Sequence, residues 1–218
     1  MKKIFAINGS PRKNGNTAEI LRDVLSGAES AGCSVELINL GDLKFSGCRS
    51  CFACKMKNGC SYGKCALRDD LTPFLEKIIQ ADAFVMGSPI YFGAETGLYR
   101  NFLERLFFPL LRYTNPPSTL AEKKLEAAFV YTMNVNEETM GLYGYKEFLD
   151  KFSKFPQMIF GSSEPETLYV FDTFQFDDYS KYESSLFDPQ HKAEVRKNQF
   201  PEDKKRAFEM GKRLAQKL

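Results

Sequence analysis

Tryptophan is absent from the 218 residues, and histidine occurs once, as His191. A single histidine argues against a Ser-His-Asp triad and against most histidine-based metal sites. The net charge is only +2, without the concentrated basic patch of nucleic-acid or membrane-surface binders. No apolar run approaches the ~20 residues of a membrane span, and the run at residues 4–7 is too short for a signal peptide. We therefore expect a cytoplasmic protein with no nucleic-acid and no membrane partner.

Hydrophobic residues make up 43% of the sequence, which is enough for a packed core, and the length fits one domain. We expect a single domain over residues 1–218, with a cysteine-rich loop at 45–68 and an aromatic C-terminal extension at 177–218. Five of the six cysteines lie in that loop. In a reducing compartment such cysteines are more often free, redox-active or metal-bound than disulfide-bonded.

Apolar runs of strand length alternate with segments of helical periodicity along the chain. The runs predict strands at 3–8, 33–40, 81–87, 125–131 and 166–176. The periodicity predicts helices at 18–32, 71–79, 97–112, 137–155 and 202–218, with Pro109 breaking or kinking the third. This alternation indicates an α/β protein whose parallel sheet is covered on both faces. With a ligand signature in the first loop, it favours a flavodoxin-like, three-layer, doubly wound, five-stranded sheet of order 2-1-3-4-5.

The loop GSPRKNGNT at residues 9–17 connects the first predicted strand to the first predicted helix. A helix N-terminus offers unpaired N–H groups and partial positive charge to a phosphate. Ser10, Asn16 and Thr17 can add donors, and Arg12 can pair with the anion. The loop matches neither a Walker A motif nor GxGxxG, which argues against nucleoside triphosphates and an NAD-type site. A polar turn with an ordinary helix cap is the alternative interpretation.

The loop SPIYFG at residues 88–93 leaves the third predicted strand at its carboxyl end, where open α/β sheets bind ligands. Tyr91 and Phe92 offer flat apolar surface, and nearby backbone amides can bond the edge of a heterocycle. The alternative is that these aromatic side chains close the core. Because the first and third strands are neighbours in the predicted order, both loops open onto one crevice.

Cys48, Cys51 and Cys54 are separated by two residues each, the spacing with which ferredoxins begin to wrap an iron–sulfur cubane. Cys60 and Cys65 follow. Zinc bound by four of these thiolates is a second possibility, although zinc sites usually combine two separated cysteine pairs. Free surface thiols are the third. Cys33 begins a strand and is most simply a core thiol.

The segments GSPRKNGNT, GCRSCFACK, KCALRDDL and GSPIYFG, in this order, resemble the NADPH-dependent FMN reductase family of flavodoxin-like proteins. The cysteine run resembles that of the iron–sulfur flavoproteins within it. The resemblance implies that Ser10, Arg12, Asn16 and Thr17 hold the FMN phosphate. It places the isoalloxazine against Pro89, Ile90, Tyr91, Phe92 and Gly93, with Met133 and Asn134 at the ring or ribityl chain.

The resemblance also implies a 4Fe-4S cluster on Cys48, Cys51, Cys54 and a fourth cysteine. The family's spacing favours Cys60, whereas its position before an Asp pair favours Cys65, which precedes Asp69 and Asp70. We take Cys60 as the predicted ligand and Cys65 as the alternative.

Three functions are compatible with these features. The first is an FMN-dependent oxidoreductase that passes electrons from NADPH or NADH, the donor implied by the family, to flavin, quinone or a similar small acceptor. The second is an iron–sulfur flavoprotein that exchanges electrons with a redox partner protein. The third is a non-enzymatic redox or metal sensor on the same fold. Excess Leu and Phe in residues 98–111 favours a subunit interface of a homodimer or homotetramer over a helix buried in one subunit.

Overall fold

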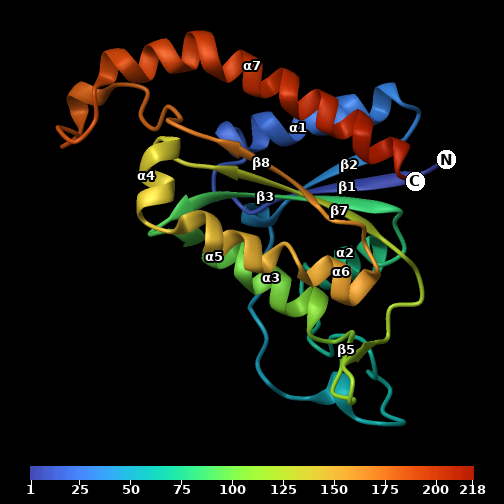
Figure 1. The fold of residues 1–218 in the computed structure, drawn as a ribbon. Helices are drawn as coiled ribbons and strands as arrows, with labels where there is room; N and C mark the ends of the chain where they lie inside the picture. The colour runs from blue at the N-terminus through green and yellow to red at the C-terminus, as the bar shows by residue number, and fades with distance from the viewer.

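The computed structural model describes residues 1–218 and has a parallel sheet at its centre, with helices on both faces (Figure 1). The sheet order is β2-β1-β3-β7-β8, and its members are β1 (Lys3–Asn8), β2 (Ser34–Asn39), β3 (Ala83–Tyr91), β7 (Glu126–Thr132) and β8 (Glu166–Val170). This confirms the predicted order 2-1-3-4-5. The short β4 (Ala94–Glu95) returns antiparallel along β3, while β5 (Leu111–Arg112) and β6 (Ser118–Thr119) form a separate hairpin.

Side chains of the central strands alternate between two hydrophobic clusters, because successive residues of a strand point to opposite faces. In β1, Ile4 and Ala6 belong to one cluster, whereas Phe5 and Ile7 belong to the other. Both faces are buried, so these strands are nearly continuous apolar runs rather than alternating ones. That is why their positions could be predicted from the sequence.

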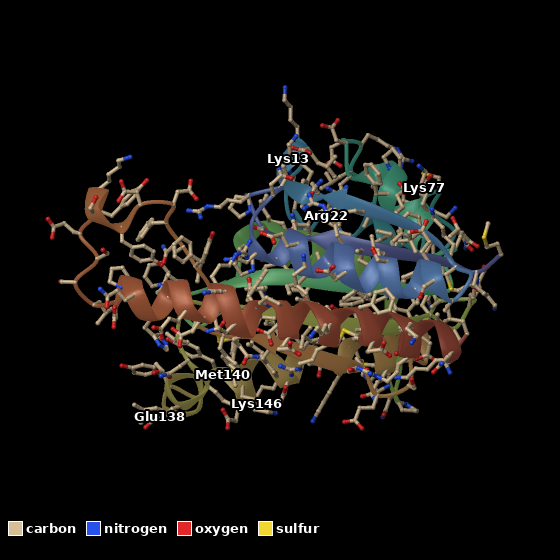
Figure 2. The ribbon with its side chains drawn as sticks, turned by 90° about the horizontal axis from the view of Figure 1, so that it is seen from above. Lys13, Arg22, Lys77, Glu138, Met140 and Lys146 are labelled. Atoms are coloured by element: carbon tan, nitrogen blue, oxygen red, sulfur yellow. The ribbon has the colours of Figure 1, made fainter.

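Two helices cover one face of the sheet and a larger group covers the other (Figure 1). The first face carries α1 (Asn16–Ser30) and α7 (Pro189–Gln216), which lie side by side in Figures 1 and 2. The second carries α2 (Thr72–Ile78), α3 (Gly97–Phe107), α5 (Tyr145–Phe152) and α6 (Phe155–Phe160). The short α4 (Glu137–Leu142) follows β7, and 3-10 turns span Leu40–Asp42, Ala53–Lys55 and Tyr179–Lys181.

Several predicted boundaries are wrong, each for a local reason. The predicted helix 137–155 is divided because Gly144 takes a left-handed conformation, with φ 66°. The fifth strand ends at Val170, and Asp172 turns the chain with φ 54°. The third helix ends at Phe107 rather than at residue 112, in agreement with the predicted break at Pro109.

The last helix begins at Pro189 rather than at residue 202. Asp188 caps it by accepting hydrogen bonds from the backbone N–H groups of Gln190 and His191. Pro201 lies within the helix and is exposed, and burial of the adjacent Phe200 outweighs the missing N–H. Most of the predicted C-terminal extension is therefore a helix that covers the sheet. No helix of the protein has both the length and the apolar character that crossing a bilayer requires.

Candidate functional site: a cleft at the strand ends and a cysteine hollow

A cleft of about 980 Å³ lies at the carboxyl ends of β1, β3 and β7. Its walls come from the loop before α1, the end of β3, the end of β7, residues 173–187 and Arg196 of α7. Open α/β sheets bind ligands at this edge, beside the point where the strand order reverses. The sheet thus brings together loops that are distant in the sequence.

The loop before α1 forms one end of the cleft. Gly15 precedes the helix in an extended conformation and gives it no side-chain cap, so N–H groups of the first turn have no side-chain partner. The Arg12 guanidinium donates to the backbone O of Gln175 at 2.8 Å, and the Asn16 side chain donates to the backbone O of Phe174 at 2.8 Å. The Thr17 hydroxyl lies 2.8 Å from that of Thr132. These polar groups converge on one helix N-terminus.

Several basic side chains lie near the start of α1, but only Arg12 and Arg196 line the cleft. Lys13 and Arg22 lie beside each other near the start of α1 (Figure 2), where Arg22 donates to the backbone O of Lys13 at 2.8 Å. From α7, Arg196 Nη2 donates to both carboxylate oxygens of Glu19, at 2.8 and 2.9 Å, and Nη1 donates to the side-chain O of Asn16 at 3.2 Å. Arg196 lines the same cleft as Arg12. Because Glu19 also lines the cleft and pairs with Arg196, Arg12 is the cleft-lining cation that remains to pair with an anion.

A tight hairpin turn forms the second wall. Tyr91 and Ala94 are paired, so only Phe92 and Gly93 lie between the strands, both with positive φ (52° and 79°). Two such residues define the turn that matches strand twist, and Phe at this position is strained. Its side chain is fully exposed, at 107%, and that of Tyr91 is 48% exposed. Strained and exposed aromatic residues on a cleft are typical of a ring-binding surface.

The end of β7 forms the floor. Met133 is buried, and the Asn134 side chain donates to the side-chain O of Gln175 at 2.7 Å. The other polar atom of that amide, Oδ1, is buried and has no hydrogen-bond partner in the protein. A buried acceptor without a partner is costly, so a ligand or a water that donates a hydrogen bond to it is favoured in this cleft.

Ten of the eleven residues predicted to bind the cofactor line this one cleft, and only Gly93 does not: the ten are Ser10, Arg12, Asn16, Thr17, Pro89, Ile90, Tyr91, Phe92, Met133 and Asn134. Sequence reasoning missed the wall at 173–187 and Arg196. The aromatic residues of the tail were a signal for the former, but no pattern marked Arg196.

A buried ion pair holds the start of the wall formed by residues 173–187. Lys192, with a side chain only 3% exposed, donates to the backbone O of Asn134 at 2.6 Å and to the Asp172 carboxylate. His191 contacts the same carboxylate at 3.1 Å. Burial alone would raise the pKa of Asp172, but hydrogen bonds from Lys192 and His191 outweigh it and hold that pKa below its ordinary value. Asp172 therefore joins the turn after β8 to the start of α7.

The cysteines form a second feature, at the other end of α3. Cys48, Cys51, Cys54 and Cys65 line one small hollow together with Glu104 and Arg105, whereas Cys60 lies outside it. All six cysteines are free thiols. Burial raises the pKa of the Cys54 thiol, partly offset by Lys55. No three Cys, His, Asp or Glu side chains of the chain lie close enough together to hold a single metal ion.

Helix α3 connects the two features. Thr96 caps its start, and the Thr96 hydroxyl donates to the backbone O of Gly9 at 2.6 Å, at the edge of the cleft. Toward its end, Glu104 accepts a hydrogen bond from the backbone N–H of Cys48 at 3.0 Å. Eleven helical residues rise about 16 Å, so the cleft and the hollow of one chain are well separated.

A doubly wound parallel sheet with a polar helix start and an exposed aromatic turn at one crevice defines the flavodoxin-like class of α/β proteins. Residues 2–143 match the NADPH-dependent FMN reductase family, and the chain belongs to that family.

The curated relatives are iron-sulfur flavoproteins. One from Methanocaldococcus jannaschii is 35% identical over 103 residues, which is 47% of this chain and 51% of the relative. One from Archaeoglobus fulgidus is 39% identical over 103 residues, covering 47% and 48% of the two chains. The match with this chain thus spans about half the length of these curated relatives.

Solved structures are similar over nearly the whole chain, at low identity. An NAD(P)H:quinone oxidoreductase from Methanothermobacter marburgensis has a TM-score of 0.70 at 14% identity and covers 98% of both chains. An FMN-dependent NADH-azoreductase from Bacillus anthracis, in complex with FMN, has a TM-score of 0.64 at 15% identity and covers 99% of this chain and 100% of its own. Similarity at this level of identity establishes the fold.

Proposed function

We propose that this protein is an FMN-dependent oxidoreductase that takes electrons from NADPH or NADH and passes them to a small acceptor such as a quinone or a flavin. The observation that carries the proposal is the convergence of ten predicted FMN-binding residues on one cleft. Membership of the NADPH-dependent FMN reductase family supports both the cofactor and the donor.

The residues of the cleft fit FMN in a defined orientation. The start of α1, with Arg12, Asn16 and Ser10, would hold the phosphate, because free N–H groups and a guanidinium suit a dianion. The turn at 91–93 would contact the ring, and Asn134 Oδ1, now without a partner, would accept a hydrogen bond from the cofactor. Bound FMN supplies the hydride and electron chemistry, and the protein binds and orients it.

The phosphate contact can be tested with a matched pair of ligands. Arg12→Gln should weaken FMN binding by roughly 10- to 100-fold, since a hydrogen bond to a charged group is lost. Riboflavin, which lacks the phosphate, should bind the variant and the wild type equally. Lys13→Gln is the control, because Lys13 does not line the cleft. Titration by flavin fluorescence measures both affinities, and anaerobic NADPH should bleach the flavin absorbance of the holoprotein. Absence of flavin binding by the wild type would refute the proposal.

A second candidate function, electron transfer through a 4Fe-4S cluster, is favoured by the cysteine hollow. Four cysteines around one hollow match the ligand set of a cubane, in which each thiolate binds its own iron. The same spacing fits a single zinc ion poorly, because no three of these side chains lie close enough together. We propose Cys48, Cys51, Cys54 and Cys65 as the ligands. Cys60, the fourth ligand predicted from spacing, is exposed and lies outside the hollow.

The ligand set can be tested by anaerobic purification with an assay of iron and acid-labile sulfide. Wild type and Cys60→Ser should both contain about 4 Fe and 4 sulfide per chain, whereas Cys65→Ser should lose them. Loss of the cluster in Cys60→Ser instead would identify Cys60 as the fourth ligand. Flavin without iron in the wild type would leave a simple FMN reductase.

A homodimer is the third part of the proposal. An apolar groove of about 190 Å³ lies between α3 and α5–α6, and its aromatic lining includes Phe107, Phe108, Phe152 and Phe155. We propose that a second copy of the chain covers this groove. The Leu and Phe residues of 98–111 do not carry this proposal, because most of them are buried within one subunit: Phe102, Leu103, Leu106, Phe107 and Leu110. Sedimentation of the holoprotein should show a species of twice the mass of the 24.8 kDa chain, or a multiple of that dimer.

A further inference from the structure

The wall of the cleft opposite the 91–93 turn is aromatic and lies outside the residues matched by the family. The match ends at residue 143, whereas this wall comes from residues 173–187. In Figure 1 this segment, between β8 and α7, extends beyond the strand ends. Its ring-bearing residues on the cleft are Phe174, Phe176, Tyr182 and Phe187. Family membership therefore does not account for it.

The wall is an ordered aromatic cluster. Tyr179 is buried at its centre, and the rings of Phe174 and Phe176 pack edge-on against it, with centroids 5.3 and 5.2 Å away. The Tyr179 hydroxyl accepts a hydrogen bond from the backbone N–H of Gln175 at 3.1 Å. Tyr182 stacks on Phe176, with centroids 4.1 Å apart and planes 12° from parallel. Such packing fixes ring orientation.

The wall is also anchored to the rest of the cleft. Thr173 donates to the backbone O of Met133 from both its N–H and its hydroxyl, at 3.0 and 3.1 Å. Arg12 and Asn16 donate to the carbonyls of the two residues that follow. The buried pair of Lys192 and Asp172 closes the base of the segment. The rings are therefore held at a set distance from the start of α1.

Despite this order, ring surface remains uncovered on both sides of the cleft. Tyr182 is 54% exposed after stacking on Phe176, and it faces a cleft whose other wall carries the exposed Tyr91 and Phe92. Apolar surface exposed to water is unfavourable and, when it is gathered in a cleft, marks a binding site. The cleft of about 980 Å³ lies at the upper end of the ~300–1,000 Å³ of small-molecule sites, which leaves room for more than one ring system.

Charge along the cleft is largely balanced. Arg196 is paired with Glu19, which also lines the cleft, and Arg12 donates to the backbone O of Gln175 on the wall where Asp177 follows Phe176. A carboxylate beside the rings disfavours a ligand that carries a phosphate or carboxylate there. The aromatic wall thus suits an uncharged conjugated ring.

We infer that Phe176, Tyr182 and Phe187 form a second ring-binding subsite, which holds an uncharged bicyclic quinone as electron acceptor by stacking. The inference rests on the proposed function for the origin of the electrons. In the overall reaction NAD(P)H gives up a hydride, which is two electrons and one proton. The quinone gains two electrons and two protons to become the quinol, and the second proton comes from water.

Equilibrium binding of 2-methyl-1,4-naphthoquinone, followed by titration calorimetry, tests the subsite directly. Tyr182→Ala should weaken binding by roughly 3- to 10-fold, the value of one aromatic stack. Leu186→Ala is the matched control, because Leu186 is 86% exposed in the same segment but does not line the cleft. It should bind the quinone as the wild type does. Equal quinone affinity in Tyr182→Ala and the wild type would overturn the inference.

Two further measurements separate this inference from the proposed function. In the holoprotein, Tyr182→Ala should raise the KM for the naphthoquinone by the same factor, while FMN affinity and the rate with ferricyanide, a non-planar acceptor, stay unchanged. A parallel fall in FMN affinity would mean that the wall holds the cofactor, and would overturn the subsite. If the wild type binds quinone at Tyr182 but binds no FMN, the proposed function fails and the subsite stands.

Discussion

Arg105 is the largest side chain that the fold buries completely, and it fastens the cysteine loop to α3. Its guanidinium donates to both carboxylate oxygens of Asp69, at 2.6 and 3.0 Å, and to the backbone O of Ser46 at 3.0 Å. Ser46 and Asp69 lie near the two ends of the cysteine loop. The Arg105 side chain therefore joins the two ends of a loop of more than 20 residues. Arginine suits this role because its planar guanidinium can bind a carboxylate in a bidentate way.

We expect Arg105→Leu to lower the free energy of unfolding by about 3 kcal/mol, because it leaves the Asp69 carboxylate and the Ser46 carbonyl without their donor. Arg105→Lys should recover only part of this, since an ammonium cannot reproduce the bidentate contact. Urea unfolding followed by circular dichroism measures both. Arg112→Leu, at an exposed position, is the control. A change below about 1 kcal/mol in Arg105→Leu would show that other contacts hold the loop.

At the scale of elements, α1 and α7 approach each other closely at two glycines. A Cβ at Gly27 would lie 1.9 Å from the backbone O of Phe208, and one at Gly211 would lie 1.9 Å from the backbone O of Val24. Neither glycine has a positive φ, so the requirement is for space rather than for a special backbone conformation. The two helices touch backbone to backbone, which holds Arg196 of α7 at the cleft and Lys192 at the ion pair with Asp172.

Gly27→Ala should destabilise the protein by about 1–3 kcal/mol, the usual cost of overpacking, because backbone rather than a flexible side chain must move. Gly141→Ala is the matched control. It also lies in a helix, but a Cβ there meets nothing within 4 Å, so the variant should be more stable by about 0.5–1 kcal/mol. Thermal unfolding of the three proteins measures the differences. Equal stability of Gly27→Ala and the wild type would mean that α1 and α7 separate without cost.

The sequence was most informative about elements with a regular pattern. The strands β1, β3 and β7 could be predicted because they are buried on both faces, and the loops that follow β1 and β3 could be assigned to one cleft from strand order alone. Arg196 could not, because its contact with Asn16 joins residues 180 positions apart and follows only from the packing of α7 on α1. The start of α7 was missed because Pro201 is an ordinary signal for a helix boundary. The grouping of Cys65 with Cys48, Cys51 and Cys54 depends on a loop path that spacing does not encode.

At the scale of the whole molecule, ionised carboxylates join elements at several separate places. Asp69 joins the cysteine loop to α3, Asp82 joins the starts of β1 and β3, Glu126 joins β7 to the chain before β8, and Asp172 joins β8 to α7. At each of them burial raises the pKa, but nearby donors outweigh burial and hold the pKa below its ordinary value. Three other carboxyls, Asp23, Glu95 and Asp203, have pKa values raised by burial.

These shifts predict how stability depends on pH. A carboxyl with a lowered pKa contributes stability that is present above its unfolded pKa, about 3.9 for Asp and 4.3 for Glu, and is lost as the pH falls through the folded pKa. The three carboxyls whose pKa values are raised act in the other direction. Their contribution to stability is lost as the pH rises above about 4. The midpoint of thermal unfolding should therefore fall steeply below about pH 4, where four junctions are protonated together, and change less between pH 5 and 7.

Asp172→Asn tests whether the junctions cause this acid sensitivity. The variant cannot ionise, so it should be less stable than the wild type at pH 7 by about 1–3 kcal/mol, because the buried Lys192 loses its carboxylate partner. That difference should shrink as the pH falls, since the wild type loses the same ion pair on protonation. Circular dichroism melts from pH 2.5 to 7 measure both proteins. A difference that stays constant with pH would place the origin of acid unfolding in charge repulsion across the surface rather than at this junction, which joins the cleft wall to the helix that covers the sheet.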